Sequence, residues 1–229
     1  MFSFDPHYML YVLIPTLLIS GAVQLYLRST YARWRQARNS SGTTGHEVGV
    51  ALFRRTSLQA VPLQVTQGEL TDHFDPRVNV VRLSQGVATQ PSVASMAIVA
   101  QELGHVQQHQ QRSPLMVARG FPVPAVTVSP MISYLMIVIG IVLGLAGLVW
   151  LGVLVFGFMV LFAFLTLPIE IDASRRGLRL LRDAGFMQTE DDAGGARKVL
   201  TAAALTCLAA AVTAVLQLLY WVMIARAQD

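Results

Sequence analysis

Residues 131–168 form an unbroken stretch that contains no charged side chain. A helix needs roughly 20 apolar residues to cross the hydrocarbon core of a bilayer. This stretch is too long for one span and therefore predicts two antiparallel transmembrane helices. We expect the hairpin to turn near Gly147–Gly152, where glycines interrupt the larger apolar side chains.

Two further stretches are long and apolar enough to cross a bilayer. Residues 8–27 lack a basic segment before them and a small-residue cleavage site, so they predict a retained anchor rather than a signal peptide. Residues 200–224 are rich in alanine, whose small side chain allows close helix packing. The sequence therefore predicts four transmembrane helices and a mainly α-helical integral membrane protein.

Composition supports a lipid environment. Hydrophobic residues make up 54% of the chain and charged residues only 13%, about half the share usual in soluble proteins. The net charge of +4 comes almost wholly from arginines that lie beside apolar stretches, which favours contact with lipid headgroups over nucleic acid. Cys207 is the only cysteine, which excludes an internal disulfide and a zinc site built from cysteines.

The basic residues predict the orientation of the chain in a plasma membrane. They follow the first and third spans and precede the fourth: Arg28, Arg33, Arg35, Arg38, Arg175, Arg176, Arg179, Arg182, Arg197 and Lys198. By the positive-inside rule, residues 29–130 and 169–199 lie in the cytoplasm and both termini lie outside, with Arg226 as the one exception.

This orientation divides the chain into five parts. They are an anchor (1–28), a cytoplasmic insert (29–130), a transmembrane hairpin (131–168), a second cytoplasmic segment (169–199), and a last transmembrane helix with its tail (200–229).

The insert has the pattern of a small α+β domain. We expect a helix that begins after Thr43 or Thr44, and β-strands within 58–66 and 78–84 with a turn at Asp75-Pro76. Residues 92–111 predict a second helix.

This second helix carries the sequence QELGH, residues 101–105. In the zinc-hydrolase motif H-E-x-x-H, two histidines one turn apart hold the metal and the glutamate acts on water. Here Glu102 and His105 occupy the matching positions, but Gln101 replaces the first histidine. The sequence His46-Glu47 begins a similar motif without a second histidine, and we interpret it as an exposed helix start.

A complete zinc site needs another ligand from elsewhere in the chain. Glu170 and Asp172 directly follow the third predicted span, on the same predicted side of the membrane as QELGH. Either carboxylate could face the metal. Alternatively, both could lie at headgroup level and pair with Arg175 or Arg176.

Five blocks of sequence, in order and over nearly the whole length, resemble the YugP-like family of membrane-bound neutral zinc metallopeptidases. They are RNSSGTTGHEVG, LTDHFDPRVNVVRLS, AQELGHVQQH, LPIEIDASRRGLRLL and GGARKVLTAAALTCLAAAV.

The resemblance implies a zincin-like insert with a gluzincin-like site. In that site Glu102 is the general base, and His105 and Glu170 bind zinc together with the residue at position 101. Asp172 would orient a ligand from behind, and Asp72 is a second such candidate in a block of unknown role that also contains His73.

Gln101 puts the occupancy of the zinc site in question, because an amide oxygen is a weak zinc donor. His109, one turn after His105, could pair with it, although this would shift the metal away from Glu102. His73 could also approach as a ligand. The simpler interpretations are that His109 lies on the helix surface and that His73 stabilises a turn.

Two functions are compatible with these residues. The first is a membrane-embedded zinc endopeptidase of impaired activity at the cytoplasmic face, whose peptide or membrane-protein substrate lies along the edge of strand 78–83. The second is an inactive pseudopeptidase that acts as a scaffold or accessory subunit of a membrane complex. In both, the partners include the lipid bilayer and exclude nucleic acid.

Overall fold

The structure is a computed structural model that describes residues 5–114, 116 and 123–228. The chain divides into two compact units. One, the apolar unit, comprises Met1–Gln24, Val117–Pro168 and Thr206–Asp229, and the other, the polar unit, comprises Leu25–Met116 and Ile169–Leu205.

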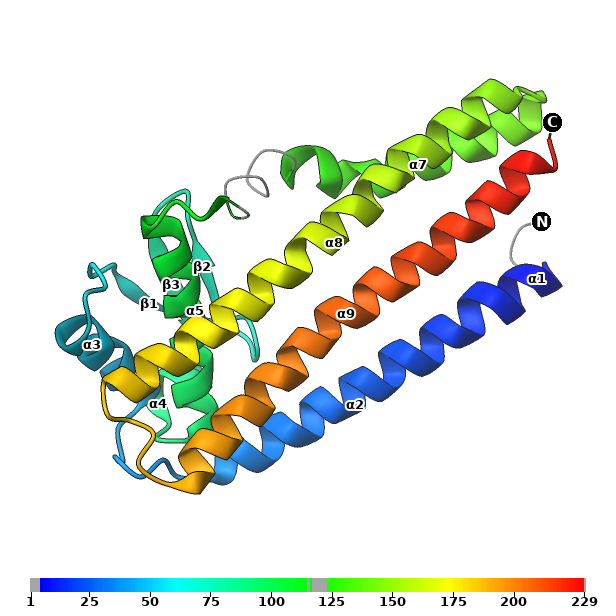
Figure 1. Cartoon of the computed structure of the whole chain (residues 1–229). Helices are drawn as coiled ribbons and strands as arrows, with labels where there is room; N and C mark the ends of the chain where they lie inside the picture. The colour runs from blue at the N-terminus through cyan, green and yellow to red at the C-terminus, as the bar shows by residue number, and fades with distance from the viewer. Residues whose placement is uncertain (1–4, 115, 117–122, 229) are drawn as a thin grey trace. The chain divides into compact units, whose positions relative to one another are not determined.

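The elements are mainly helical and are labelled in Figure 1. The helices are α1 (Pro6–Tyr8), the π-helix η2 (Met9–Leu13), α2 (Ile14–Gln36), α3 (Gly45–Arg55), α4 (Gln85–Thr89), α5 (Val93–Gln110), α7 (Val123–Leu143), α8 (Ala146–Asp183) and α9 (Glu190–Arg226). The strands are β1 (Leu63–Thr66), β2 (His73–Asp75) and β3 (Val80–Ser84).

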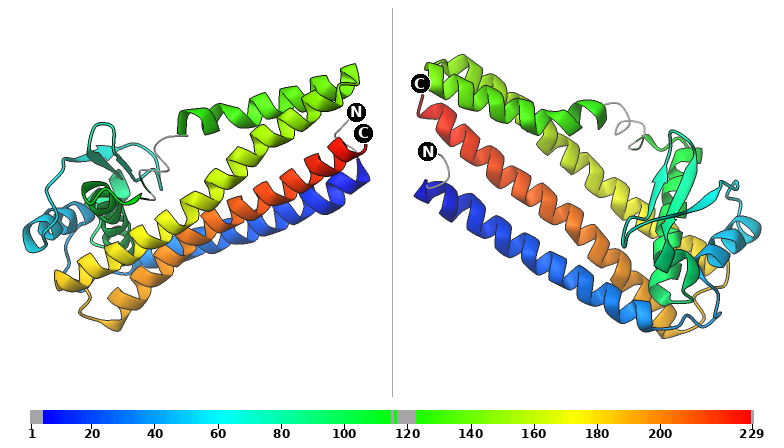
Figure 2. Two further views of the ribbon diagram at one scale, coloured as in Figure 1. Left: turned by 45° about the horizontal axis from the view of Figure 1, so that its top comes forward. Right: turned by 180° about the vertical axis from the view of Figure 1, so that it is seen from behind.

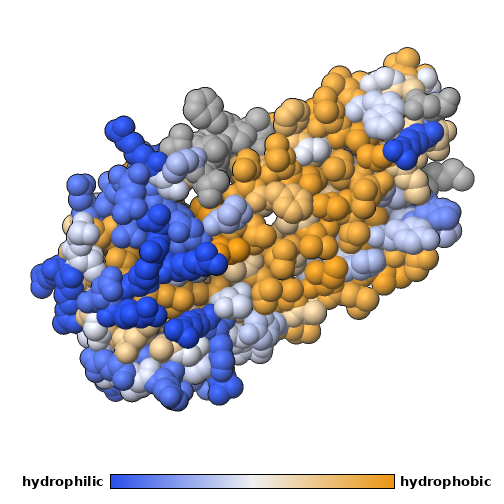
Figure 3. Space-filling view, viewed as in Figure 1, coloured by the Kyte–Doolittle hydropathy of each residue, from blue (hydrophilic) through white to orange (hydrophobic). Residues whose placement is uncertain are grey.

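Within the part of the chain that the structure describes, three helical segments are long and apolar enough to cross a membrane, and they are the long helices of Figure 2: Pro6–Gln36, Ala146–Asp183 and Glu190–Arg226. A shorter apolar helix covers Val128–Leu143. Large hydrophobic side chains such as Leu18, Val142 and Phe158 are exposed on these helices, and Figure 3 shows the hydrophobic residues that dominate the surface of the apolar unit on the face in view. These surfaces require lipid to cover them, which confirms a membrane protein.

The helical hairpin is present, but its turn lies earlier in the chain than predicted. Helix α7 ends at Leu143, and α8 begins at Ala146, so Gly147 and Gly152 lie inside a helix. Gly144 makes the turn with a φ of 66°. The backbone N–H of Leu145 donates to the carbonyl of Gly140 at 2.8 Å, which closes the helix end as a Schellman motif. Gly152 instead allows close packing, because a Cβ there would lie 2.7 Å from Ile137.

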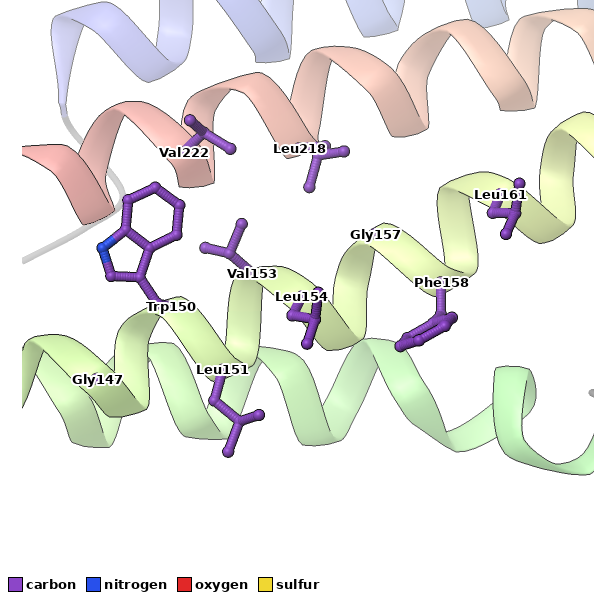
Figure 4. Close-up of a pocket in the computed structure, with 10 residues that line it drawn as sticks. All are labelled: Gly147, Trp150, Leu151, Val153, Leu154, Gly157, Phe158, Leu161, Leu218 and Val222. Carbon is purple, nitrogen blue, oxygen red and sulfur yellow. The ribbon is translucent and has the colours of Figure 1, made fainter.

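A groove of about 710 Å³ lies along α8 and α9 within the apolar unit. Figure 4 shows its lining, which includes Trp150, Leu154, Phe158 and Leu218. All of the lining residues are apolar or glycine. The groove therefore offers no titratable or nucleophilic group, and the candidate catalytic residues lie elsewhere.

In the polar unit, α3 begins where the sequence predicted. Thr44 is the N-cap, its hydroxyl accepts from the backbone N–H of Glu47, and the Glu47 carboxylate accepts from the backbone N–H of Thr44. This capping box satisfies two backbone donors at the helix start. His46 and Glu47 are exposed, so the first His-Glu pair is a helix start, as expected.

The sheet differs from the prediction in two respects. It has three strands in the order β1-β3-β2, with β1 parallel and β2 antiparallel to β3. Strand β2 was not predicted, because its three residues are too few to show a periodic pattern. The expectation that strand 78–83 forms an edge is wrong, since both sides of β3 are already paired. This strand therefore cannot capture a peptide by edge pairing.

Candidate metal centre

Helix α5 aligns the first and last residues of QELGH toward α8. Gln101 and His105 are four residues apart and therefore lie on one face of the helix. Both reach Glu170 of α8: Gln101 Nε2 donates to Glu170 Oε2 at 3.3 Å, and His105 Nε2 lies 3.4 Å from the same oxygen. The side chains of His105 and Glu170 are only 12% and 16% exposed. The structure thus brings together three of the predicted site residues.

Two glycines allow the helices to approach closely enough for these contacts. A Cβ at Gly104 would overlap the carbonyl oxygen of Ala173, and a Cβ at Gly177 would lie 2.6 Å from the carbonyl oxygen of Ala100. At the crossing, each helix contributes one glycine, and each glycine faces an alanine of the other helix. Gly104 in QELGH is therefore a packing residue, and it brings α5 within reach of Glu170.

The side chain of Glu102 lies on a different face of α5 from Gln101 and His105, and it is buried. Its Oε2 accepts a hydrogen bond of 2.9 Å from the backbone N–H of Phe74 in β2. Burial raises the pKa of Glu102, and His105 opposes this shift. A carboxylate with a raised pKa takes up a proton more readily than an exposed one does.

His105 has hydrogen-bond partners at both ring nitrogens. Nδ1 lies 3.1 Å from Gln108 Oε1, and Nε2 faces Glu170. Burial opposes the charged ring, but the contact with Glu170 and the charge of Glu102 outweigh it, so the pKa of His105 is raised. The ring is thus fixed in orientation, with Nε2 directed at the carboxylate.

Gln108 is a residue of this site that the sequence analysis missed. It is buried, and its Nε2 donates to the carbonyl oxygen of Ile169 at 3.0 Å and to Asp172 Oδ2 at 2.8 Å. Arg176 Nε donates to Asp172 Oδ2 at 2.6 Å. Asp172 therefore contacts Gln108 and Arg176. The pair with Arg176 agrees with the alternative interpretation of this carboxylate.

The remaining candidates lie in other surroundings. His109 is exposed, and its ring packs against Phe74 with the centroids 5.5 Å apart. His73 is exposed in β2, where Nδ1 contacts the carbonyl oxygen of Thr71 at 2.8 Å and Nε2 lies 3.4 Å from Arg82. Both arrangements match the simpler interpretations, a helix-surface residue and a residue that stabilises local chain geometry.

Asp72, directly before β2, binds the last residue of β3. Its carboxylate accepts from the backbone N–H of Ser84 at 2.6 Å and from the Ser84 hydroxyl at 3.0 Å. Burial raises the pKa of Asp72, while the hydrogen bonds from Ser84 lower it. These contacts give Asp72 a structural role at the end of β3.

The donor atoms of these side chains fit a zinc ion, although the Gln101 amide oxygen is a weak ligand. Two ligands of a tetrahedral zinc ion, each at about 2.1 Å, lie roughly 3.4 Å apart, and His105 Nε2 and Glu170 Oε2 have this spacing. The end of the Gln101 side chain lies at a similar distance from Glu170, and the amide, turned over, presents an oxygen. Among the described residues, however, no three His, Cys, Asp or Glu side chains form a metal-binding group.

The polar unit thus combines a QExxH helix with a glutamate from a second helix. Over residues 8–226 the chain matches the family described as "Putative neutral zinc metallopeptidase". The chain belongs to this family, which confirms the resemblance found in the five sequence blocks.

One curated relative is "Putative membrane protease YugP" of Bacillus subtilis (strain 168). The two sequences are 34% identical over 215 residues, which cover 94% of this chain and 95% of that protein. No solved structure matches the chain.

Proposed function

We propose that the chain is a membrane-embedded zinc metallopeptidase whose affinity for zinc is reduced by Gln101. The observation that supports this function best is the convergence of His105, Glu170 and Gln101, with Glu102 on the same helix. Family membership supports zinc as the metal, and the relative described as a membrane protease supports a peptide substrate.

Each polar residue has a distinct chemical task in this proposal. His105 and Glu170 would hold zinc, and the Gln101 amide oxygen would be a weak third ligand. Zinc, when bound, polarises the peptide carbonyl and increases the acidity of water. Glu102 would take the proton from the attacking water and deliver it to the leaving nitrogen. The backbone N–H of Phe74 would hold one Glu102 oxygen in place during both proton transfers.

A second candidate function is an inactive scaffold or accessory subunit of a membrane complex. Gln101 favours this alternative, because its amide N–H donates to Glu170 where an active family site would have a metal-binding imidazole. Zinc content distinguishes the two functions, since a scaffold has no need of the metal.

The first test measures zinc binding and casein cleavage by the purified chain. Replacement Glu170→Gln should reduce zinc affinity by more than about 10-fold, because it removes one of two strong donors. Any chelator-sensitive cleavage should be lost with it. Glu190→Gln, at an exposed position in the first turn of α9, is the matched control and should change neither property. Equal zinc affinity in the Glu170→Gln variant and the parent would refute the proposed centre.

The proposed topology has four spans in the plasma membrane, with α7 as the second, and the 29–130 insert in the cytoplasm. The distribution of arginines supports it. In a Cys207→Ala background, an impermeant maleimide applied to intact cells should label Gln228→Cys. Ser41→Cys should react only after the cells are permeabilised. The opposite pattern of labelling would refute this topology, because it would place the 29–130 insert outside the cell.

A further inference from the structure

The side-chain amide of Gln108 can take only one orientation. Gln108 is 1% exposed, and one end of its amide contacts the Ile169 carbonyl oxygen and the Asp172 carboxylate. A backbone carbonyl and an ionised carboxylate only accept hydrogen bonds, so this end must be the NH₂ group. The oxygen of Gln108 therefore faces His105 Nδ1, at 3.1 Å.

This orientation determines which nitrogen of His105 carries a proton. An amide oxygen only accepts, so the contact requires a proton on Nδ1. The nitrogen that remains for a metal ion is Nε2, and this is the atom that faces Glu170 at 3.4 Å. The ring thus faces Glu170 with Nε2, the nitrogen that would bind a metal ion.

The amide is itself held by a connected series of polar contacts. Arg176 donates to Asp172, and Asp172 accepts from Gln108. Arg176 also donates to Gln107 and Gln111, the first on α5 and the second directly after it. The orientation of Gln108 is therefore set from α8, and a change at Asp172 would reach His105 only through the amide.

We propose that Gln108 is a positioning residue that keeps Nδ1 of His105 protonated and directs Nε2 toward Glu170 for metal binding. The inference rests on the proposed function in one respect, namely that Nε2 is a zinc ligand. Partners of this kind behind a ligand histidine typically change metal affinity about 10–100-fold when they are removed.

The experiment compares three variants of the full-length protein in lipid nanodiscs. Gln108→Leu removes the acceptor for Nδ1–H. Gln110→Leu, on the same helix, removes contacts with Gln59 but none with His105 or Arg176, and is the matched control. Gln108→Met keeps nearly the length of the glutamine side chain but likewise offers no oxygen to Nδ1–H.

Two properties are measured. The first is the exchange-protected Nδ1–H signal of His105 in metal-free, ¹⁵N-histidine-labelled protein, assigned with His105→Asn. The second is zinc affinity, measured by competition with a chelator. Gln108→Leu should lose the protected signal and bind zinc about 10–100-fold more weakly. Gln110→Leu should retain both properties, and Gln108→Met should show the same two losses as Gln108→Leu.

Persistence of the signal in either Gln108 variant, or its loss in Gln110→Leu, would overturn the inference. If Gln108→Leu does not fold, Gln108→Met decides by itself. A parent chain that binds no zinc refutes the proposed function, but the signal from metal-free protein still tests Gln108. The two failures are therefore distinguishable.

Discussion

Replacement of Gln101 by histidine is expected to increase zinc affinity by more than about 100-fold, since a ligand should contribute more than its supporting residues. Position 101 is one turn before His105 on the same face of α5, and the glutamine side chain already reaches Glu170. An imidazole there would give the centre two histidines and a glutamate, a donor set typical of catalytic zinc. The cost in helix propensity is only tenths of a kcal/mol.

Zinc titration of the purified protein against a competing chelator measures this gain. Gln110→His is the matched control, because it adds a histidine to the same helix five residues after His105, at a position that contacts Gln59 and not the site. It should leave zinc affinity nearly unchanged. If Gln101→His bound zinc no more tightly than the parent, the site would not be a metal centre. Family membership would then describe ancestry alone, and the scaffold function would be favoured.

The sequence predicted the helices well where local signals are strong. Thr44 and Glu47 form a capping box that is written directly in the sequence, and α3 begins there. The stretch 92–111 contains no proline, and α5 runs through it without a break at Gly104. Hydrophobic length alone identified the long apolar helices. Each of these signals depends only on residues near one another in the chain.

The failures concern features that depend on distant residues. Nothing local distinguishes Gly144, which makes the turn, from Gly152, which packs against Ile137. Strand β2 exists because it pairs with β3, and the resulting pairing removes the edge that was expected there. Gln108 looks like one more glutamine in a run of polar residues, yet its partners Ile169 and Asp172 lie more than sixty positions away.

Glu102→Gln, made in the Gln101→His background, is expected to preserve zinc binding and to reduce casein cleavage by about 10²–10⁴-fold, the usual contribution of a general base. Glu102 lies next to the Gln101 position in sequence, but it contacts Phe74 in β2 rather than Glu170. A glutamine can keep the hydrogen bond from the Phe74 N–H through its amide oxygen. The fold around β2 should therefore survive, and only the ability to accept a proton is lost.

Zinc content and cleavage measured on one preparation separate three roles for this carboxylate. Loss of cleavage with full zinc content identifies a base. Loss of both would make Glu102 a ligand or a structural residue, and unchanged cleavage would assign proton transfer to another group. The contact with Phe74 makes the distinction sharp, because the backbone N–H fixes one oxygen of Glu102 and a glutamine keeps that contact. Only the first outcome agrees with a peptidase site in which Gln101 is the single defect.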